Sequence, residues 1–262
     1  MKIVAITAQS GLAFLHRYQR ERPLDLDDDR FVRLHEWFLH ELSTIGSLSD
    51  YVNDAERASY REFCSRCQRR YLAIKEAEAN KNLLAVASNA RAPIGENLSS
   101  RDRKAYDRVS DLRKLVDFRH CENIVMVGSG AFPSALLWLR DNFPKLRYVG
   151  LDIDARCVKM ATELVAALGI DNVHFKLIDG RQYDFCGIDF VYVANTVVPK
   201  RAVLEQIARS TSVRQVVVRE PSPIGELVAE AVRPNLPPVF VADAAGAAGG
   251  FSMSYDLLLR RV

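Results

Sequence analysis

The sequence from Asn123 to Pro133, NIVMVGSGAFP, leads from an apolar, β-prone segment through two closely spaced glycines into a proline. Gly128 and Gly130 allow the backbone to approach a ligand closely because they carry no Cβ. Pro133 suits the first turn of a helix, where its missing N–H is no loss. A glycine turn between a strand and a helix is where a nucleotide-like cofactor crosses the end of a doubly wound sheet. The stretch therefore predicts an α/β fold with a cofactor site at Gly128, Ser129 and Gly130.

The same alternation continues to the end of the sequence. Strands are expected at 123–127, 147–151, 173–178, 188–193 and 215–219, with helices at 133–140, 155–168 and 199–210 between them. Strands that alternate with helices indicate a parallel sheet with right-handed crossovers. Two further runs, 239–242 and 251–259, flank an Ala/Gly-rich loop and predict an antiparallel pair at one edge. We therefore expect a Rossmann-like, doubly wound domain over residues 119–262.

Residues 1–118 are expected to form a separate helical domain. Acids at 27–29 are typical of a helix start, and Phe31, Leu34, Phe38 and Leu42 follow at helical spacing. A second apolar face covers Tyr60–Tyr71, and a third helix is expected through Ile74–Leu84. Residues 92–95 break the pattern, and Ser99 and Asp102 resemble a capping box for one more helix, which carries Tyr106.

Bulk composition gives no reason to expect a nucleic-acid or membrane partner. The 262 residues carry 36 basic and 33 acidic side chains, so a net charge of +3 gives no indication of a nucleic-acid or membrane partner. No apolar run approaches the ~20 residues needed to span a bilayer, and the expected location is the cytoplasm. Five cysteines are odd in number and scattered. Cys64 and Cys67 have C-x-x-C spacing, but they lie on an apolar helix face without a second pair, so buried thiols and no metal site are expected.

Two acids at predicted strand ends strengthen the cofactor hypothesis. Asp152, followed by Ile153, ends the second strand and is placed to accept both hydroxyls of an adenosine ribose. Asp179, followed by Gly180, ends the third strand and can accept from an adenine amino group. Either acid could instead cap a turn or the next helix. Ala194, after the fourth strand, completes the expected set of cofactor-binding residues.

Two cofactors compete for this site. The pyrophosphate of NAD favours G-x-G-x-x-G, in which the third glycine permits tight packing of helix on strand, but that position is Pro133 here. S-adenosylmethionine (SAM) carries no phosphate and makes fewer demands on the loop. The expected antiparallel pair at the end of the sequence also fits SAM enzymes better. SAM is therefore the expected co-substrate.

The string Val127–Pro133, together with Asp152-Ile153-Asp154, resembles the nicotianamine synthase family. It is similar in particular to the bacterial histidine 2-aminobutanoyltransferases of opine metallophore (staphylopine and pseudopaline type) biosynthesis. The resemblance implies a helical N-terminal domain before a SAM-binding Rossmann-like domain. It also implies transfer of the 2-aminobutanoate group of SAM to the amine of histidine, with release of methylthioadenosine. The sequence departs from the plant synthases at Gly130-Ala131-Phe132-Pro133 and after Glu78, which favours a single transfer onto one amino acid.

The resemblance further implies two catalytic residues, Glu78 and Tyr106. From the residues alone, Glu78 could equally be a solvated helix residue near Glu76, and Tyr106 could pack with Val109 and Leu112. A small-molecule SAM methyltransferase is the alternative enzyme, and a SAM-binding module without turnover is the alternative from another class. A homodimer is compatible with the apolar faces of the N-terminal helices.

Overall fold

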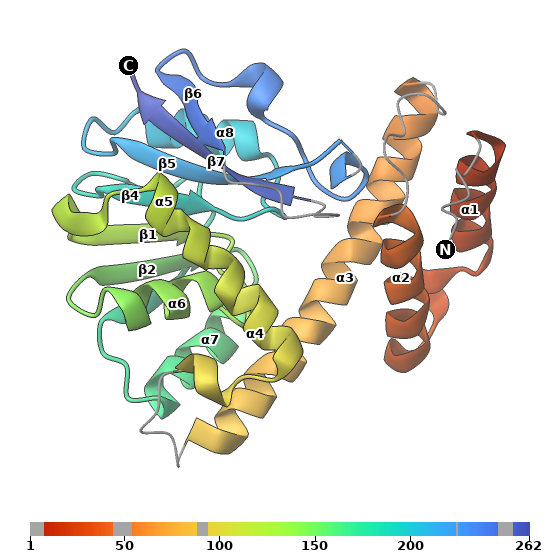
Figure 1. Cartoon of the computed structure of the whole chain (residues 1–262), viewed down its shortest axis with the longest axis horizontal. Helices are drawn as coiled ribbons and strands as arrows, with labels where there is room; N and C mark the ends of the chain where they lie inside the picture. Colours follow the sequence, from red (N-terminus) through yellow and green to blue (C-terminus); the bar gives the residue numbers. More distant parts are fainter. Residues whose placement is uncertain (1–7, 44–53, 88–93, 224, 246–253) are drawn as a thin grey trace. The chain divides into compact units, whose positions relative to one another are not determined.

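The computed structural model describes residues 8–43, 54–87, 94–223, 225–245 and 254–262 (Figure 1). Its contacts divide the chain into two compact units. The first comprises Met1–Ile74, Pro221–Ala229 and Ala248–Tyr255, and the second comprises Lys75–Glu220, Glu230–Ala247 and Asp256–Val262. The boundaries of these units differ from the expected domain boundary at residue 118. That boundary stays a prediction.

A seven-stranded sheet occupies the described residues after 120. Its strands are β1 (Asn123–Val127), β2 (Arg147–Asp152), β3 (Val173–Leu177), β4 (Phe190–Val193), β5 (Gln215–Pro221), β6 (Phe240–Ala245) and β7 (Ser254–Arg261). Their order across the sheet is β3-β2-β1-β4-β5-β7-β6. Neighbours from β3 to β5 pair in parallel, and β6 pairs antiparallel with β7. The predicted strands are confirmed to within a few residues where they are described.

The strand order places the end of β1 at a topological switch point. From β1 the chain winds through β2 to β3, then crosses back to β4 on the other side of β1. The chain leaves β1 and β4 toward opposite faces of the sheet, and the carboxyl ends of two such strands are the usual ligand position in open α/β sheets.

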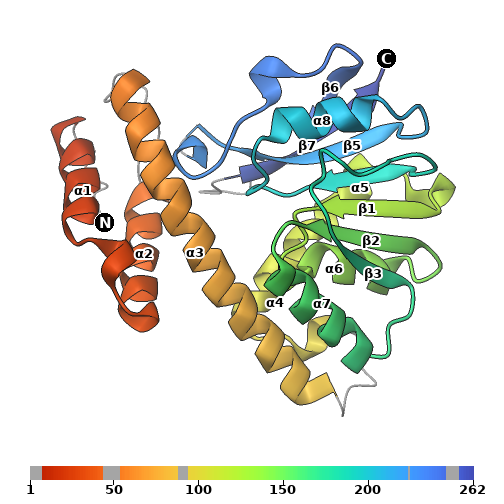
Figure 2. The ribbon, with the colours of Figure 1, turned by 180° about the vertical axis from the view of Figure 1, so that it is seen from behind.

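Helices cover both faces of this sheet. They are α4 (Ser100–Asp107), α5 (Leu112–Leu115), α6 (Ser134–Asn142), α7 (Ala155–Ala167) and α8 (Lys200–Ala208). Figures 1 and 2 show α4, α5 and α6 on one face and α8 on the opposite face. Side chains of α6 such as Leu136 and Leu139 are fully buried against strand residues such as Ile124 and Phe190. The expected doubly wound α/β architecture is therefore confirmed.

The first unit is built from helices around an aromatic core. It contains α1 (Ala8–Arg20), α2 (Asp28–Ser43) and the first part of α3 (Asp54–Ala87). Tyr18 stacks on Phe38 with ring centroids 4.1 Å apart, and Cys64 and Cys67 are buried free thiols in the same core. Among the described residues, the longest helices are too polar to cross a bilayer.

The prediction of separate helices between residues 60 and 84 is wrong. One helix, α3, runs from Asp54 to Ala87 because this segment contains neither glycine nor proline to end it. Conversely, the segment after Ser99 is broken: α4 is followed by a 3-10 turn η3 (Arg108–Asp111) before α5. Shorter 3-10 turns complete the described structure: η1 (Pro23–Asp25), η2 (Ile94–Asn97), η4 (Phe118–His120), η5 (Gly225–Leu227) and η6 (Arg233–Asn235).

Candidate functional site

The loop after β1 is a tight glycine turn over the end of β2. Gly128 and Gly130 have φ angles of 77° and 69°, in the left-handed region that favours glycine. The main-chain N–H groups of Gly128 and Ser129 both donate to the carbonyl oxygen of Leu151, at 2.8 and 3.1 Å. A Cβ on Gly128 would lie 2.6 Å from Cγ2 of Val197, so the loop after β4 also approaches closely.

Asp152 lies directly beside this turn. Its Oδ2 accepts the main-chain N–H of Gly130 at 2.8 Å, and its Oδ1 accepts that of Asp154 at 2.9 Å. Asp154 itself accepts from Arg156 and caps α7. The carboxylate of Asp152 is thus fixed at the end of β2, next to Gly130, where a ribose crossing the glycine turn would meet it.

A second carboxylate, that of Glu76 on α3, reaches the same turn. Its Oε2 accepts the main-chain N–H of Ala131 at 2.9 Å. A Cβ on Gly130 would overlap this carboxylate, which gives a second reason for glycine at that position. Burial raises the pKa of Glu76 to about 7, helped by the nearby charge of Asp152 and opposed by the main-chain N–H groups of Ala131 and Phe132. A carboxyl group that titrates near neutrality can take up and release a proton at working pH.

Asn80 holds the same helix onto the turn. It is 1% exposed, and its Nδ2 donates to the carbonyl oxygens of Ala131 and Met160 at 2.8 and 3.0 Å. Glu76 and Asn80 are four residues apart and therefore share one helix face. Sequence reasoning did not assign Asn80 to the site; its i, i+4 spacing from Glu76 is the pattern that could have found it.

The structure does not bring Glu78 to the turn. Two residues along a helix correspond to a rotation of about 200°, so Glu78 points away from the face that carries Glu76. Its side chain is 55% exposed, and its Oε2 lies 2.6 Å from Nζ of Lys75. A catalytic role for Glu78 stays a prediction.

Tyr106 is buried, as a core residue would be. Its hydroxyl donates to Oδ2 of Asp141 at 2.6 Å, and burial raises its pKa, followed by the effect of that hydrogen bond. Asp141 lies in the last turn of α6, seven residues after Ser134 and thus about 10 Å along the helix from the glycine turn. The structure does not bring Tyr106 beside Asp152 or Glu76, and its catalytic role stays a prediction.

The other expected residues line the carboxyl ends of β3 and β4. A Cβ on Gly180 would lie 2.7 Å from Cγ1 of Val127. Ala194 donates its main-chain N–H to the carbonyl oxygen of Val127 at 3.0 Å. Asp179 is held by Arg181, whose Nη2 lies 2.6 Å from its Oδ2, and this lowers the pKa of Asp179. The carboxylate of Asp179 could accept from adenine only if Arg181 shared or released that carboxylate.

Apolar side chains are exposed around the same strand ends. Ile153, Leu177 and Val198 are 73%, 57% and 57% exposed, and they follow or end β2, β3 and β4 respectively. Large aliphatic groups rarely face water without reason when several are grouped at one end of a sheet. Leu177 and Val198 were not predicted as site residues, because the sequence does not show that these aliphatic side chains are exposed.

Ser129 has an unusual environment. Its side chain is 2% exposed, and its Oγ is the one buried side-chain oxygen or nitrogen in the described part of the chain without a hydrogen-bond partner. A buried hydroxyl without a partner is costly and often indicates a ligand or water.

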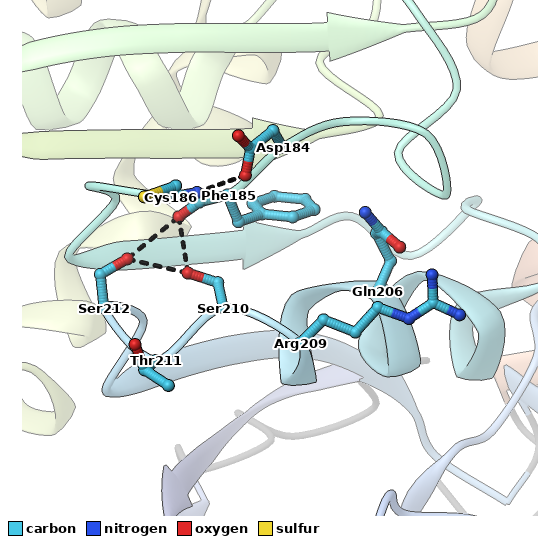
Figure 3. Close-up of a pocket in the computed structure, with 8 residues that line it drawn as sticks. All are labelled: Asp184, Phe185, Cys186, Gln206, Arg209, Ser210, Thr211 and Ser212. Carbon is cyan, nitrogen blue, oxygen red and sulfur yellow. Dashed lines mark hydrogen bonds between the residues drawn. The ribbon is translucent and has the colours of Figure 1, made fainter.

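A pocket near the opposite end of the sheet is less suited to a ligand (Figure 3). It is lined by Asp184, Phe185, Cys186, Gln206, Arg209, Ser210, Thr211 and Ser212, which precede β4 and β5. The hydroxyls of Ser210 and Ser212 bond to each other and to the carbonyl oxygen of Phe185, and Asp184 accepts the N–H of Cys186. These polar groups satisfy one another, so the glycine turn remains the candidate site.

Comparison with known proteins reveals a likeness to solved structures over most of the chain. No protein-family model matches it, and no curated protein sequence does. The structure of MtNAS, a nicotianamine synthase, in complex with MTA and tNA superposes with a TM-score of 0.75 and 19% identity, covering 95% of this chain and 96% of that one. A glutamate-to-glutamine variant of MtNAS in complex with S-adenosylmethionine gives 0.69 and 19%, covering 95% and 97%. The likeness to MtNAS covers 95% of the chain, and the predicted fold class is confirmed.

Proposed function

We propose that this chain is a transferase that moves the 2-aminobutanoate group of SAM to the amine of an amino acid, with histidine as the acceptor and methylthioadenosine as the by-product. The product would be an amino-acid conjugate of the kind used as a metallophore. One observation carries the proposal: the Asp152 carboxylate lies against the Gly128–Gly130 turn, in a fold that matches a SAM-bound MtNAS structure over 95% of the chain.

The residues at the turn have the right chemistry for SAM. Asp152 accepts one main-chain N–H on each oxygen, and its remaining lone pairs would accept the two ribose hydroxyls in charge-assisted hydrogen bonds. Ile153, Leu177 and Val198 offer apolar surface to the adenine ring. The unpartnered Oγ of Ser129 offers a hydrogen bond within the same loop. Nothing in this arrangement requires a phosphate, which distinguishes it from a dinucleotide site.

The reaction needs a deprotonated amine and little else from the protein. The acceptor nitrogen uses its lone pair to form a bond to the γ-carbon of the aminobutanoate arm. The carbon–sulfur bond breaks, and its electron pair stays on sulfur, which leaves as neutral methylthioadenosine. The proton displaced from nitrogen passes to a base. Holding the amine and the carbon in line is the main contribution of the site.

We assign the base to Glu76 in preference to Glu78. Glu76 lies at the glycine turn, and burial raises its pKa to about 7. A base is most effective when its pKa is near the operating pH. Glu78 is exposed and paired with Lys75 on another side of the helix. The sequence left the choice between the two glutamates open. Because they lie on different sides of α3, the contact of Glu76 with the turn favours Glu76 as the base.

The test is the identity of the nucleoside product. The purified full-length chain is incubated with SAM and a mixture of amino acids, and the products are separated by chromatography and weighed by mass spectrometry. Methylthioadenosine together with histidine heavier by one aminobutanoate group is the expected result. S-adenosylhomocysteine as the sole nucleoside would make the chain a methyltransferase and overturn the proposal. SAM binding without any product would leave a binding module.

A further inference from the structure

A buried polar cluster joins residues of strands β4, β5 and β7. The carboxylate of Asp256 accepts from the hydroxyl of Tyr192, with 3.1 Å between the oxygens. Its second oxygen lies 3.0 Å from Nη1 of Arg219, and the Arg219 and Asp256 side chains are only 13% and 4% exposed. Burying three such groups is costly unless they are paired, which suggests a role besides packing.

The sheet register places this cluster near the candidate site. Tyr192 pairs with Val217, so Arg219, two residues further along β5, lies on the same face as Tyr192. Both are close to the carboxyl ends of their strands, and Asp256 is near the start of the antiparallel β7, at the same end. Ala194 follows Tyr192 by two residues, and a Cβ on Gly128 would lie 3.3 Å from its Cβ. The cluster therefore borders the glycine turn on one side.

Arg108, from η3, adds a second positive charge near this cluster, close enough for Arg219 and Asp256 to affect its pKa. Its neighbour Val109 is buried in the same core as Tyr192. Asp256 already balances Arg219, and burial, followed by the charge of Asp256, raises the pKa of Tyr192, which keeps the phenol neutral. The described residues provide no hydrogen bond or ion pair to the Arg108 guanidinium.

The surroundings of Arg108 are those of a side chain at a ligand site. Solvent reaches it, since the residue is exposed. Burial, followed by repulsion from Arg219, nevertheless lowers the pKa of Arg108, while Tyr192 and Asp256 act in the opposite direction. An arginine that is both accessible and partly desolvated binds a carboxylate well, because its planar fork matches two oxygens.

We propose that Arg108, backed by the Tyr192–Asp256–Arg219 cluster, binds the carboxylate of an α-amino acid in the candidate site. The inference rests on the proposed function and names the part of the substrate that this side of the site recognises. Two molecules can present such a carboxylate: the methionine part of SAM and the acceptor amino acid. The experiment is arranged to tell them apart.

The test compares Arg108→Met with Lys114→Met. Lys114 is a matched control because its side chain is 81% exposed and pairs only locally with Asp111. Calorimetry measures the Kd of each protein for SAM and for methylthioadenosine, which lacks the carboxylate. Turnover experiments measure KM for histidine and for histamine, its decarboxylated analogue. Loss of a hydrogen bond to a charged group weakens affinity by about tenfold or more.

Either of two results supports the inference. A weaker Kd for SAM with an unchanged Kd for methylthioadenosine assigns Arg108 to the methionine carboxylate. A higher KM for histidine with unchanged kinetics for histamine assigns it to the acceptor. Arg108→Lys, which keeps the charge and loses the fork, is expected to lie between wild type and Arg108→Met in the same measurement.

The inference is overturned if folded Arg108→Met matches Lys114→Met in all four measurements. This outcome differs from a failure of the proposed function. If the wild-type protein does not bind SAM at all, the proposed function is wrong and the inference fails with it. If the wild type binds SAM and forms product, while Arg108→Met behaves in the same way, only the carboxylate site is wrong.

Discussion

Glu76 and Ala131 are joined by a 2.9 Å hydrogen bond from the main-chain N–H of Ala131 to Oε2 of Glu76. The bond carries a carboxylate from α3 onto the turn after β1, 55 residues further along the sequence. Asp152 accepts the preceding N–H, that of Gly130. Two carboxylates therefore accept consecutive main-chain N–H groups of one turn, and their proximity is one cause of the raised pKa of Glu76.

Replacing Glu76 tests the assignment of the base. Glu76→Gln keeps the size and most hydrogen bonds but cannot take up a proton, and removal of a general base typically costs about 10²–10⁴ in rate. We expect such a loss in kcat with a nearly unchanged Kd for SAM. In the wild type, kcat should fall as the pH drops below about 7, because Glu76 becomes protonated there. Glu78→Gln is the matched control and should stay within a few-fold of wild type; the reverse ranking would return the role to Glu78.

Replacing Asp152 tests the cofactor site. Asp152→Ala removes the acceptor for two ribose hydroxyls, and each hydrogen bond to a charged group is worth roughly 1.5–3 kcal/mol. SAM affinity measured by calorimetry should therefore weaken by well over tenfold, with an unchanged circular dichroism spectrum. Asp154→Asn serves as the control, because asparagine caps a helix about as well as aspartate. Equal affinities of the two variants would remove Asp152 from the site.

Two glycines with similar φ angles separate backbone strain from crowding. Gly130 and Gly169 have φ angles of 69° and 65°. A Cβ on Gly169 would meet no atom within 4 Å, whereas one on Gly130 would overlap the Glu76 carboxylate. Both alanine variants should lose about 1–2 kcal/mol of unfolding free energy from the left-handed conformation. Only Gly130→Ala should also lose SAM binding and turnover; retention of both would show that the Glu76 contact does not shape the turn.

Acid should destabilise the helical unit through His35. This side chain is fully buried, bonded by Nδ1 to Tyr18 and by Nε2 to Gln68, and burial lowers its pKa from 6.5 to about 4. Between these two pH values the unfolded chain binds a proton that the folded chain does not, so the unfolding free energy falls as the pH falls. The full effect is about 3 kcal/mol, at 1.36 kcal/mol per pKa unit.

Urea unfolding at several pH values measures this dependence. At pH 6.5, His35→Gln should be less stable than the wild type, because it loses ring contacts in the core. Its unfolding free energy should change less than that of the wild type between pH 6.5 and 4. The nearby carboxylate of Glu36, which raises the pKa of His35, reduces the effect without reversing it. A slope equally steep in both proteins would assign the acid sensitivity to other groups.

The strands and the glycine turn were predictable because their information is local. Residues 123–133 carry a buried β run, two glycines and a proline in the order that the fold requires, and β1 was predicted with its observed bounds. Asp152 could be predicted for the same reason, since it follows its strand directly. Hydrophobic periodicity does not show the continuity of α3, because its apolar faces resemble those of separate helices, although no residue between them ends a helix.

The partners of side chains from distant segments could not be predicted in this way. Glu76 and Glu78 are the same residue type in one helix, and the contacts of Glu76 and Asn80 with Ala131 determine which glutamate faces the turn. The bond from Tyr106 to Asp141 and the pair of Arg219 with Asp256 join residues whose proximity depends on the complete sheet. Hydrophobic periodicity predicts which residues are buried, but it does not predict which polar side chains form contacts with one another.

The position of β7 has a consequence for how the protein is made. Ser254–Arg261 are translated after every other strand described, yet β7 lies inside the sheet between β5 and β6. At roughly 5–20 residues per second, the ribosome takes a few seconds to pass from the end of β5 to β7. During that time the nascent chain presents β5 as an open sheet edge, which is a template for aggregation. Ribosomal pausing in this interval would therefore lower the yield of soluble protein, and a chaperone that covers the β5 edge would raise it.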